Sequence, residues 1–184
     1  WPYANNPNVT TIRLCATDLT PPANDTPCGA TVLQPSDPCS FVSASTEAAT
    51  TELGNVQLIP GDGPCTPGSG ADVWYRVDVP PPGLRVRSEF GTLTDLALEV
   101  YTQVGGNDCS DAQLQLVECV RSAYPDEAPE LIALTPTNTT FWLRAYGPAG
   151  VGRFSLCMEA IAAASNDDPC DAILVEPPVS YTHL

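Results

Sequence analysis

Two short stretches of the sequence carry aromatic and arginine side chains at a spacing that suits ligand stacking. Trp74 and Arg76 lie two positions apart, and Trp142, Arg144 and Tyr146 repeat the alternation. Residues two apart in a strand share a face, so each stretch would present a tryptophan beside a guanidinium, a surface on which sugars stack. The same residues would also suit the covered second face of a sandwich or the seat of a neighbouring domain, with arginine stacked on tryptophan. We favour this second interpretation.

Four oxygen-bearing residues stand where strands are expected to begin, which makes them candidate calcium ligands. They are Asn24, Asp25, Asp72 and Asp95. Extracellular calcium sites use carboxylate, amide and backbone oxygens, but turns and domain-opening caps use the same residue types. No EF-hand spacing is present. Calcium is therefore the one cofactor that the pattern leaves open, and we expect no other.

The sequence offers little for catalysis. A serine or cysteine nucleophile needs a neighbouring base, and the single histidine, His183, lies within residues 179–184. That tail has two interpretations, a genuine strand end or the translated read-through of a sequencing adapter. Asp95 and Glu99 could form a carboxylate pair of the type used in glycoside hydrolysis, but we favour solvated surface charge as the explanation. We expect no catalytic residues and no enzyme.

The eight cysteines and the charge narrow the class of protein. No CxxC pair is present and there is one histidine, so disulfides are favoured over a zinc site. Disulfides predict an oxidising compartment, and hence an extracellular or cell-surface protein. The net charge is −15 and all seven basic residues are arginine, so nucleic acid is a poor partner. No apolar run approaches the ~18 residues of a membrane span, so we expect no membrane insertion.

An internal repeat joins the two ends of the sequence. Residues 12–35 align without a gap on residues 154–177, at an offset of 142 residues that places Cys15 on Cys157. Each copy reads as an apolar strand ending in cysteine, a short linker, and an Asn-Asp-x-Pro-Cys motif that opens a new strand. Identical pairs include Leu14 and Leu156, Asn24 and Asn166, Asp25 and Asp167, Pro27 and Pro169, and Cys28 and Cys170.

The repeat predicts where domains begin and end. Residues 1–22 would be the last strands of a preceding repeat, residues 24–162 a complete domain, and residues 166–184 the start of a following repeat. The chain would thus be a slice of a tandem array, whose partners include its own neighbouring domains.

The complete domain reads as strands. Between residues 71 and 160 apolar residues repeatedly alternate with polar ones, as in strands that bury one face. The best helix candidate, Ser45–Leu53, lacks an apolar stripe and reads equally as strand or loop. We therefore predict an all-β fold, an antiparallel β-sandwich. The alternating segments are Val73–Val79, Leu84–Ser88, Leu96–Val100, Leu114–Leu116, Leu131–Leu134, Phe141–Leu143 and Phe154–Met158.

Several motifs within residues 24–160 resemble, in order and spacing, the pre-peptidase C-terminal domains and related repeats of large secreted or cell-surface bacterial proteins. The resemblance implies a jelly-roll-like sandwich, attached to secreted enzymes or adhesins and without activity of its own. The motifs are Asn24-Asp25-x-x-Cys28, Ala71-Asp72-Val73-Trp74-Tyr75, Leu98-x-Val100-Tyr101, Cys109 through Cys119, Phe141-Trp142-Leu143-Arg144-Ala145-Tyr146 and Gly152-x-Phe154-Ser155-Leu156-Cys157.

These observations predict a noncatalytic module that serves as a spacer or adhesion domain in a long extracellular or surface repeat protein. Two alternatives stay open. One is a carbohydrate-binding module that recognises surface glycans, and the other is an accessory domain of a secreted hydrolase.

The cysteine spacing predicts local disulfides first. Cys109 and Cys119 flank a short segment, and Cys39 and Cys65 flank a Gly/Pro-rich stretch. The remaining four cysteines have two arrangements: Cys15 with Cys28 and Cys157 with Cys170, or Cys28 with Cys157. We favour Cys28 with Cys157, which gives the complete domain three internal bonds and joins its first strand to its last, as the resemblance also suggests.

Overall fold

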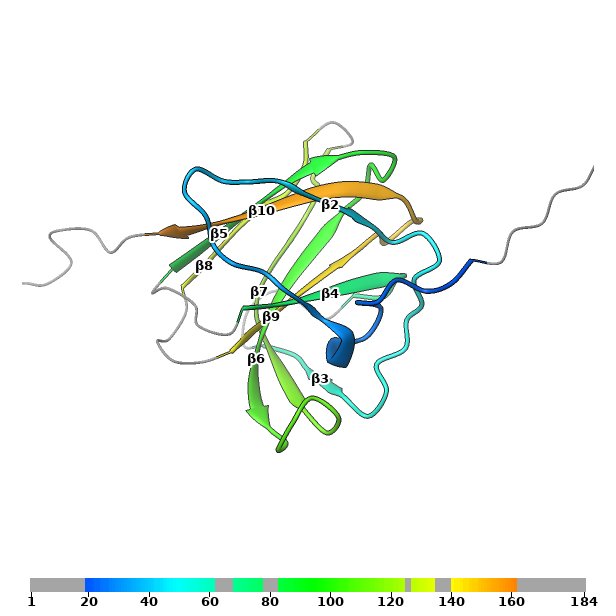
Figure 1. Ribbon diagram of the computed structural model, residues 1–184, viewed down its shortest axis with the longest axis vertical. Coiled ribbons are helices and arrows are strands. Elements are labelled where there is room, and N and C mark those ends of the chain that lie inside the picture. Colours follow the sequence, from blue (N-terminus) through cyan, green and yellow to red (C-terminus); the bar gives the residue numbers. More distant parts are fainter. Residues whose placement is uncertain (1–18, 62–67, 78–82, 125–126, 135–139, 162–184) are drawn as a thin grey trace, which may run out of the picture.

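The computed structural model describes residues 19–61, 68–77, 83–124, 127–134 and 140–161. Within them the chain forms strands and one short 3-10 helix (Figure 1). The predicted flanking repeats fall almost wholly in residues 1–18 and 162–184, outside the described residues. The elements are η1 (Pro27–Gly29), β1 (Thr31–Val32), β2 (Val42–Ser45), β3 (Gln57–Ile59), β4 (Asp72–Val77), β5 (Gly83–Phe90), β6 (Ala97–Gly105), β7 (Gln113–Arg121), β8 (Glu130–Leu134), β9 (Phe141–Tyr146) and β10 (Arg153–Ile161).

The strands form two sheets that pack face to face. One sheet has the order β1-β4-β9-β6-β7-β3, and the other has the order β2-β10-β5-β8. From β4 onward the chain crosses between the sheets at nearly every connection, with the β6–β7 hairpin as the exception. The predicted β-sandwich is confirmed, and the alternating segments between residues 71 and 160 correspond to β4 through β10.

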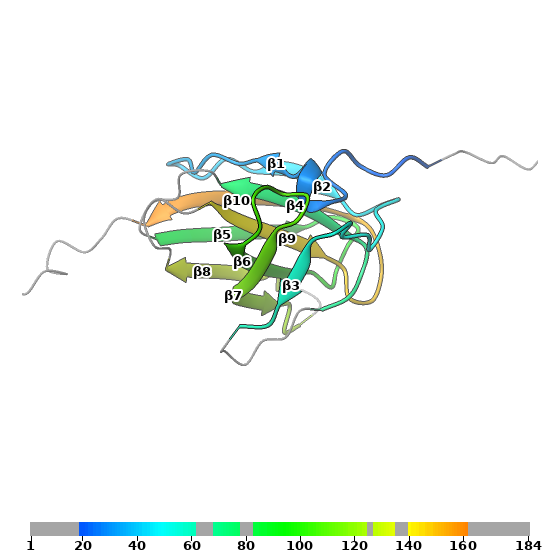
Figure 2. The same ribbon diagram turned by 90° about the horizontal axis from the view of Figure 1, so that it is seen from below.

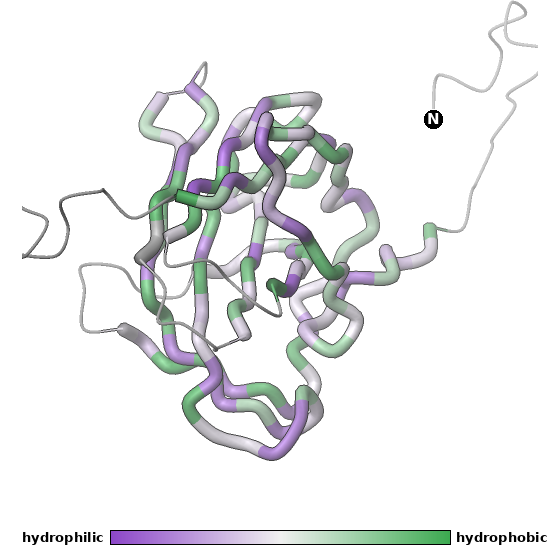
Figure 3. Tube along the Cα trace, turned by 60° about the vertical axis from the view of Figure 1, so that its left-hand side comes forward, coloured by the Kyte–Doolittle hydropathy of each residue, from purple (hydrophilic) through white to green (hydrophobic). Residues whose placement is uncertain are grey.

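Alternation along the strands builds the core between the sheets. Val73, Tyr75 and Val77 of β4 face Leu156 and Met158 of β10 across the interface, within one continuous apolar cluster. Figure 3 shows hydrophobic and hydrophilic residues interleaved along the strands rather than gathered in long runs. This period of two is what a strand with one buried face requires.

Two short strands, β2 and β3, were not predicted, whereas β1 follows the Asn-Asp-x-Pro-Cys motif that was predicted to open a strand. Two of these three short strands depart from the antiparallel pattern. β1 pairs parallel with β4, and β3 pairs parallel with β7, each at an edge of the larger sheet. Strands of two or three residues are too short to show a period in the sequence. Ser45–Leu53 forms no helix: Ser45 ends β2, and the residues after it form turns and irregular backbone.

The outer face of the six-stranded sheet holds a second apolar cluster. Trp74, Tyr101, Trp142, Leu114 and Leu116 belong to it. The segment before β1 covers the β4 side of this face, because Trp74 N–H donates to the Asn24 carbonyl at 2.8 Å and β1 then pairs with β4. This larger sheet is therefore apolar on both of its faces.

The disulfides differ from the predicted pairs. Cys28 is bonded to Cys109, with Cα atoms 5.2 Å apart, and Cys39 is bonded to Cys157, with Cα atoms 5.6 Å apart. Cys119 is also disulfide-bonded, to none of these four. The predicted pairs Cys28 with Cys157, Cys39 with Cys65, and Cys109 with Cys119 are therefore wrong.

The sheet order explains these errors. Cys109 precedes β7 and Cys119 lies near its far end, so roughly 20 Å of extended strand separates them. The first strand, β1, and the last, β10, belong to different sheets, which keeps Cys28 away from Cys157. Cys157 instead meets the loop after β1, where Ser36 N–H donates to the Met158 carbonyl at 2.9 Å. Cys15, Cys65 and Cys170 lie outside the described residues.

Candidate functional site

The five predicted stacking residues lie together on the outer face of the six-stranded sheet. β4 and β9 are antiparallel neighbours, and their register places Trp74 opposite Arg144 and Arg76 opposite Trp142. Tyr146 lies two residues beyond Arg144 on the same face. The two stretches, far apart in the sequence, thus form one cluster, as their shared alternation suggests.

This cluster is not an exposed platform. Trp74 is 0 % exposed, Trp142 2 % and Arg144 3 %. The Arg144 guanidinium lies 5.7 Å from the Trp74 ring and 4.7 Å from the Tyr146 ring, and the Arg76 guanidinium lies 5.9 Å from the Trp142 ring. The arginines stack on the aromatics inside a covered face, which is the second of the two interpretations of the sequence pattern.

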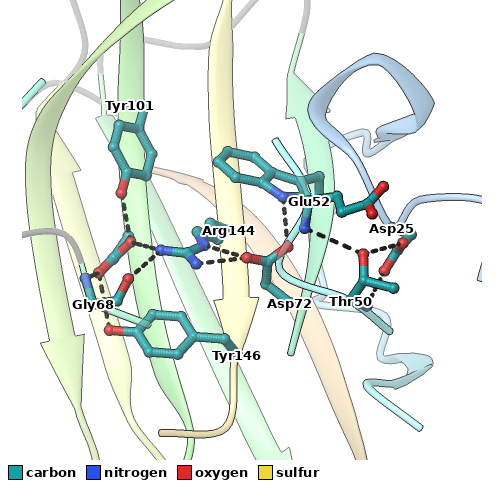
Figure 4. A network of polar contacts seen from close by, with 10 residues as sticks. Asp25, Thr50, Glu52, Gly68, Asp72, Tyr101, Arg144 and Tyr146 are labelled. Atoms are coloured by element: carbon teal, nitrogen blue, oxygen red, sulfur yellow. Dashed lines mark hydrogen bonds and ion pairs between the residues drawn. The ribbon is translucent and has the colours of Figure 1, made fainter. Parts of the chain in front are cut away.

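Arg144 is the centre of a buried ionic network (Figure 4). Its Nε and Nη2 atoms donate to Oδ2 of Asp72 at 2.8 and 2.5 Å. Its Nη1 atom donates to Oε2 of Glu99 at 3.1 Å and to the carbonyl oxygen of Gly68 at 2.8 Å. Asp72 is 0 % exposed and Glu99 2 %, so all three charges are removed from water. We call these residues, with Trp74, Tyr101 and Tyr146, the Arg144 network.

Both carboxylates of the Arg144 network are fully engaged. Trp74 Nε1 donates to Oδ1 of Asp72 at 2.8 Å. Glu99 accepts from the Tyr101 hydroxyl at 2.5 Å, from the Tyr146 hydroxyl at 2.9 Å and from the backbone N–H of Gly68 at 2.7 Å. Each of the four carboxylate oxygens therefore has a protein donor, which is what a buried charge requires.

Burial sets the protonation of the Arg144 network. It raises the pKa of Asp72 above its ordinary value, although Arg144 opposes the shift. It also raises the pKa of Tyr101 and Tyr146, and the charge of Glu99 adds to both shifts. For Arg144 burial alone would lower the pKa, but Asp72 and Glu99 outweigh it and raise the pKa. At neutral pH the arginine is charged and both tyrosines are neutral.

This arrangement joins structural elements. Asp72 opens β4, Glu99 lies on β6 and Arg144 on β9, and Gly68 brings the loop before β4 onto the same group. Every polar atom that could act on a ligand is committed to a neighbour. The network thus connects β4, β6, β9 and the loop before β4. A fully hydrogen-bonded network of this kind also favours one strand register.

The predicted calcium ligands have protein partners. The Asp25 carboxylate accepts from the Thr50 N–H at 2.5 Å and from its hydroxyl at 2.7 Å. Asn24 Nδ2 donates to the Trp74 carbonyl at 3.1 Å. Asp72 belongs to the Arg144 network. Among the described residues, no group of three or more His, Cys, Asp or Glu side chains is placed to hold a metal ion.

Asp95, the fourth predicted calcium ligand, lies at the surface beside an arginine. It accepts from Nε and Nη2 of Arg121 at 3.0 and 2.7 Å. Its predicted companion in a carboxylate pair, Glu99, is instead buried in the Arg144 network. The two acids therefore occupy different environments and do not form a shared site.

Sequence reasoning did not place Glu99, Tyr101 and Gly68 beside Arg144, or Thr50 beside Asp25. The parity of β6 already separates Glu99 and Tyr101 from Leu98 and Val100. What the sequence does not show is that β6 lies next to β9, with Glu99 opposite Arg144. Thr50 and Gly68 lie in irregular segments that carry no periodic signal.

The chain matches no protein-family model and no curated protein. Solved structures with a similar arrangement include CorA, a surface-associated copper-binding protein important in copper acquisition by Methylomicrobium album BG8. It is 7 % identical, the match covers 74 % of this chain and 100 % of that one, and the TM-score is 0.45. Another is the Yersinia pseudotuberculosis-derived mitogen, at 12 % identity, 77 % and 97 % coverage, and a TM-score of 0.38. Such distant likenesses carry no argument about function.

Two further findings concern location. Disulfides such as Cys28–Cys109 and Cys39–Cys157 persist in oxidising compartments, which favours an extracellular or cell-surface protein. Within the described residues, no helix has the length and hydropathy needed to cross a bilayer. The resemblance to pre-peptidase C-terminal domains stays a prediction.

Proposed function

We propose that the chain contains one complete unit of a tandem array of noncatalytic β-sandwich domains, which acts as a spacer or adhesion segment of a long extracellular or surface protein. The observation that carries this proposal is the role of the Asn-Asp-x-Pro-Cys motif. In the described domain this motif attaches the start of the unit to its own sheet. A second copy of the motif, at Asn166–Cys170, would attach the start of another unit.

Each residue of the motif has a defined task. Asn24 is held on β4 by hydrogen bonds in both directions, Asn24 Nδ2 to the Trp74 carbonyl and Trp74 N–H to the Asn24 carbonyl. Asp25 fixes Thr50. Pro27 begins η1, and Cys28 is bonded to Cys109. These are tasks of assembly, which supports a structural role for both copies of the motif.

The Arg144 network supports the noncatalytic part of the proposal. Its carboxylates and guanidinium are saturated by one another and by neighbouring donors, so they are committed to holding the fold. The carbohydrate-binding alternative loses its main support, because Trp74 and Trp142 are buried. No specific contact in the described residues favours an accessory role beside a hydrolase.

Labelling the free thiols of the chain tests whether it is part of a tandem array. By the repeat, Cys15 is equivalent to Cys157 and Cys170 to Cys28, so their partners would lie in neighbouring units. We expect alkylation of the unfolded but unreduced chain to modify Cys15 and Cys170 alone. A bridge from Cys15 to Cys28, or from Cys157 to Cys170, would contradict self-contained units.

Glycan binding separates the spacer from its alternative. The folded chain, screened against an array of surface glycans, should show no specific binding if it is a spacer. Reproducible binding of one glycan class would contradict the spacer role and favour an adhesion or carbohydrate-binding module.

A further inference from the structure

We infer that consecutive units of this protein pack end to end as a stiff rod, with the β10 end of one domain seated against the Asn24–Asp25 end of the next. The inference rests on the proposed function, because it requires that the residues after β10 open a second copy of the fold. The partner that each end surface fits is thus another unit of the same chain.

The linker between units is short. β10 ends at Ile161, and the next Asn-Asp motif begins at Asn166, which leaves residues 162–165 between them. Residues 20–23 hold the same place before Asn24. Including the bonds at both ends, such a linker spans at most about 18 Å, whereas a domain of this size has a radius of gyration of about 14 Å. Two domains joined in this way lie close enough to touch.

The downstream half of the linker already belongs to the domain that follows it. The backbone N–H of Asp25 donates to the carbonyl of Pro22 at 3.0 Å, and Asn24 is held on β4 in both directions. Proline at positions 21 and 22 fixes φ at both residues. At this first linker, rotation is therefore concentrated upstream of Pro21, whereas the linker at residues 162–165 has alanine in place of both prolines.

The two attachment points lie at opposite ends of the sandwich. Figures 1 and 2 both show the described chain entering at one end, before η1, and leaving the tip of β10 at the other. Units joined through these points extend the array along one direction. A side-by-side arrangement would need a linker that returns along the whole domain, and four residues cannot do so.

Leu19 is an exposed apolar residue at the predicted boundary with the preceding unit. By the repeat it is equivalent to Ile161, the residue that ends β10 opposite Gly83. Ile161 is half-buried in the described domain, whereas Leu19 is 73 % exposed. In an array, the preceding unit would cover Leu19 with its own equivalent of β5, as β5 covers Ile161 here.

An in-frame duplication of the period tests the rod. Residues 24–165 are inserted once more after Ser165, so that the natural linker, residues 162–165, joins Ile161 of one complete unit to Asn24 of the next. Small-angle X-ray scattering then compares the lengthened chain with the original. We expect the maximum dimension to rise by about 40 Å, close to one domain diameter, with the profile of a single elongated particle.

A matched control lengthens only the linker. Eight Gly and Ser residues, placed between Ala164 and Ser165 at the same junction, should give a broad distribution of dimensions typical of a flexible tether. If the duplicated chain already behaves like this control, or if its maximum dimension rises by less than about 20 Å, the rod is overturned.

Thiol counting separates this result from a failure of the proposed function. The duplicated chain should still carry two reactive thiols, at its first and last cysteine, because the inserted unit closes its own disulfides. Additional reactive thiols, or a lost unfolding transition, would show that residues 24–165 are not a unit, and the proposed function would fall with the rod.

Discussion

The Glu99 carboxylate on β6 and the Arg144 guanidinium on β9 are direct register partners, 3.1 Å apart, and both are almost completely buried. Asp72 approaches the same guanidinium from β4, on the other side of β9. One guanidinium thus pairs with acids from the two strands that flank β9. Its removal would leave two buried carboxylates without a counterion.

Replacement of Arg144 by methionine should therefore lower the free energy of unfolding by about 3 to 5 kcal/mol, because breaking a buried pair leaves uncompensated charge in the core. Urea titration followed by tryptophan fluorescence measures the change. Arg121→Met is the control, since that arginine forms an exposed pair with Asp95, and it should leave the midpoint unchanged. A loss below about 1 kcal/mol for Arg144→Met would contradict this account.

Buried tyrosines should make the fold sensitive to alkali. Burial raises the pKa of Tyr75 from its ordinary 10.0 to about 12, and it also raises the pKa of Tyr101 and Tyr146. Above pH 10 the unfolded chain loses protons that the folded chain keeps, so the free energy of unfolding falls as pH rises from 10 toward 12. In pH jumps, the tyrosinate absorbance of these three buried residues should appear with unfolding, not before it.

A matched variant isolates one tyrosine of this set. Tyr101→Phe removes one group that ionises on unfolding above pH 10. The number of protons released on unfolding, which the slope of the unfolding free energy against pH reports, should therefore fall by about one. Fast ionisation of all tyrosines in the native state would contradict their burial.

Peptide mapping without reduction should recover two crosslinks, Cys28 with Cys109 and Cys39 with Cys157. We expect Cys119 to be found with Cys65. Gly61 lies against Leu116 on β7, and Gly68 donates to Glu99, the register partner of Cys119. The chain on both sides of Cys65 therefore lies beside β7. A crosslink from Cys119 to Cys15 or Cys170 would refute this pairing and join the units covalently.

Asp25→Ala should loosen the cover over the second apolar cluster. The substitution leaves the Thr50 N–H and hydroxyl without the acceptor that they now share, which should lower the free energy of unfolding by about 1 to 3 kcal/mol. Hydrogen exchange should rise at Trp74, whose amide donates to Asn24. Asp37→Ala, at an exposed position, is the control, and equal effects of the two substitutions would contradict the role of Asp25.

Period-two alternation was sufficient to predict β4 through β10 and the shared face of Trp74 and Trp142. It could not predict what lies on that face. Trp74 and Trp142 show the same pattern whether they meet water or a covering segment. The cover includes Ala30, Leu53 and Leu58, which lie in segments too short or irregular to show a period. Burial of a polar strand face is decided by distant segments.

The predicted disulfide pairs were wrong for a related reason. Sequence spacing favours pairing Cys109 with Cys119, but an intervening strand makes near neighbours in sequence distant in space. Cys157 lies on β10, within a segment predicted as strand, yet its partner depends on which sheet that strand joins. Strand order is a property of the whole chain, and local patterns do not contain it.

The pairing of Cys39 with Cys157 has a consequence for synthesis and export. The two cysteines are 118 residues apart, and the second lies on the last strand of the unit. A chain synthesised from its amino terminus therefore cannot close this bond until Cys157 has been made, and a chain that stops before β10 leaves Cys39 without this partner.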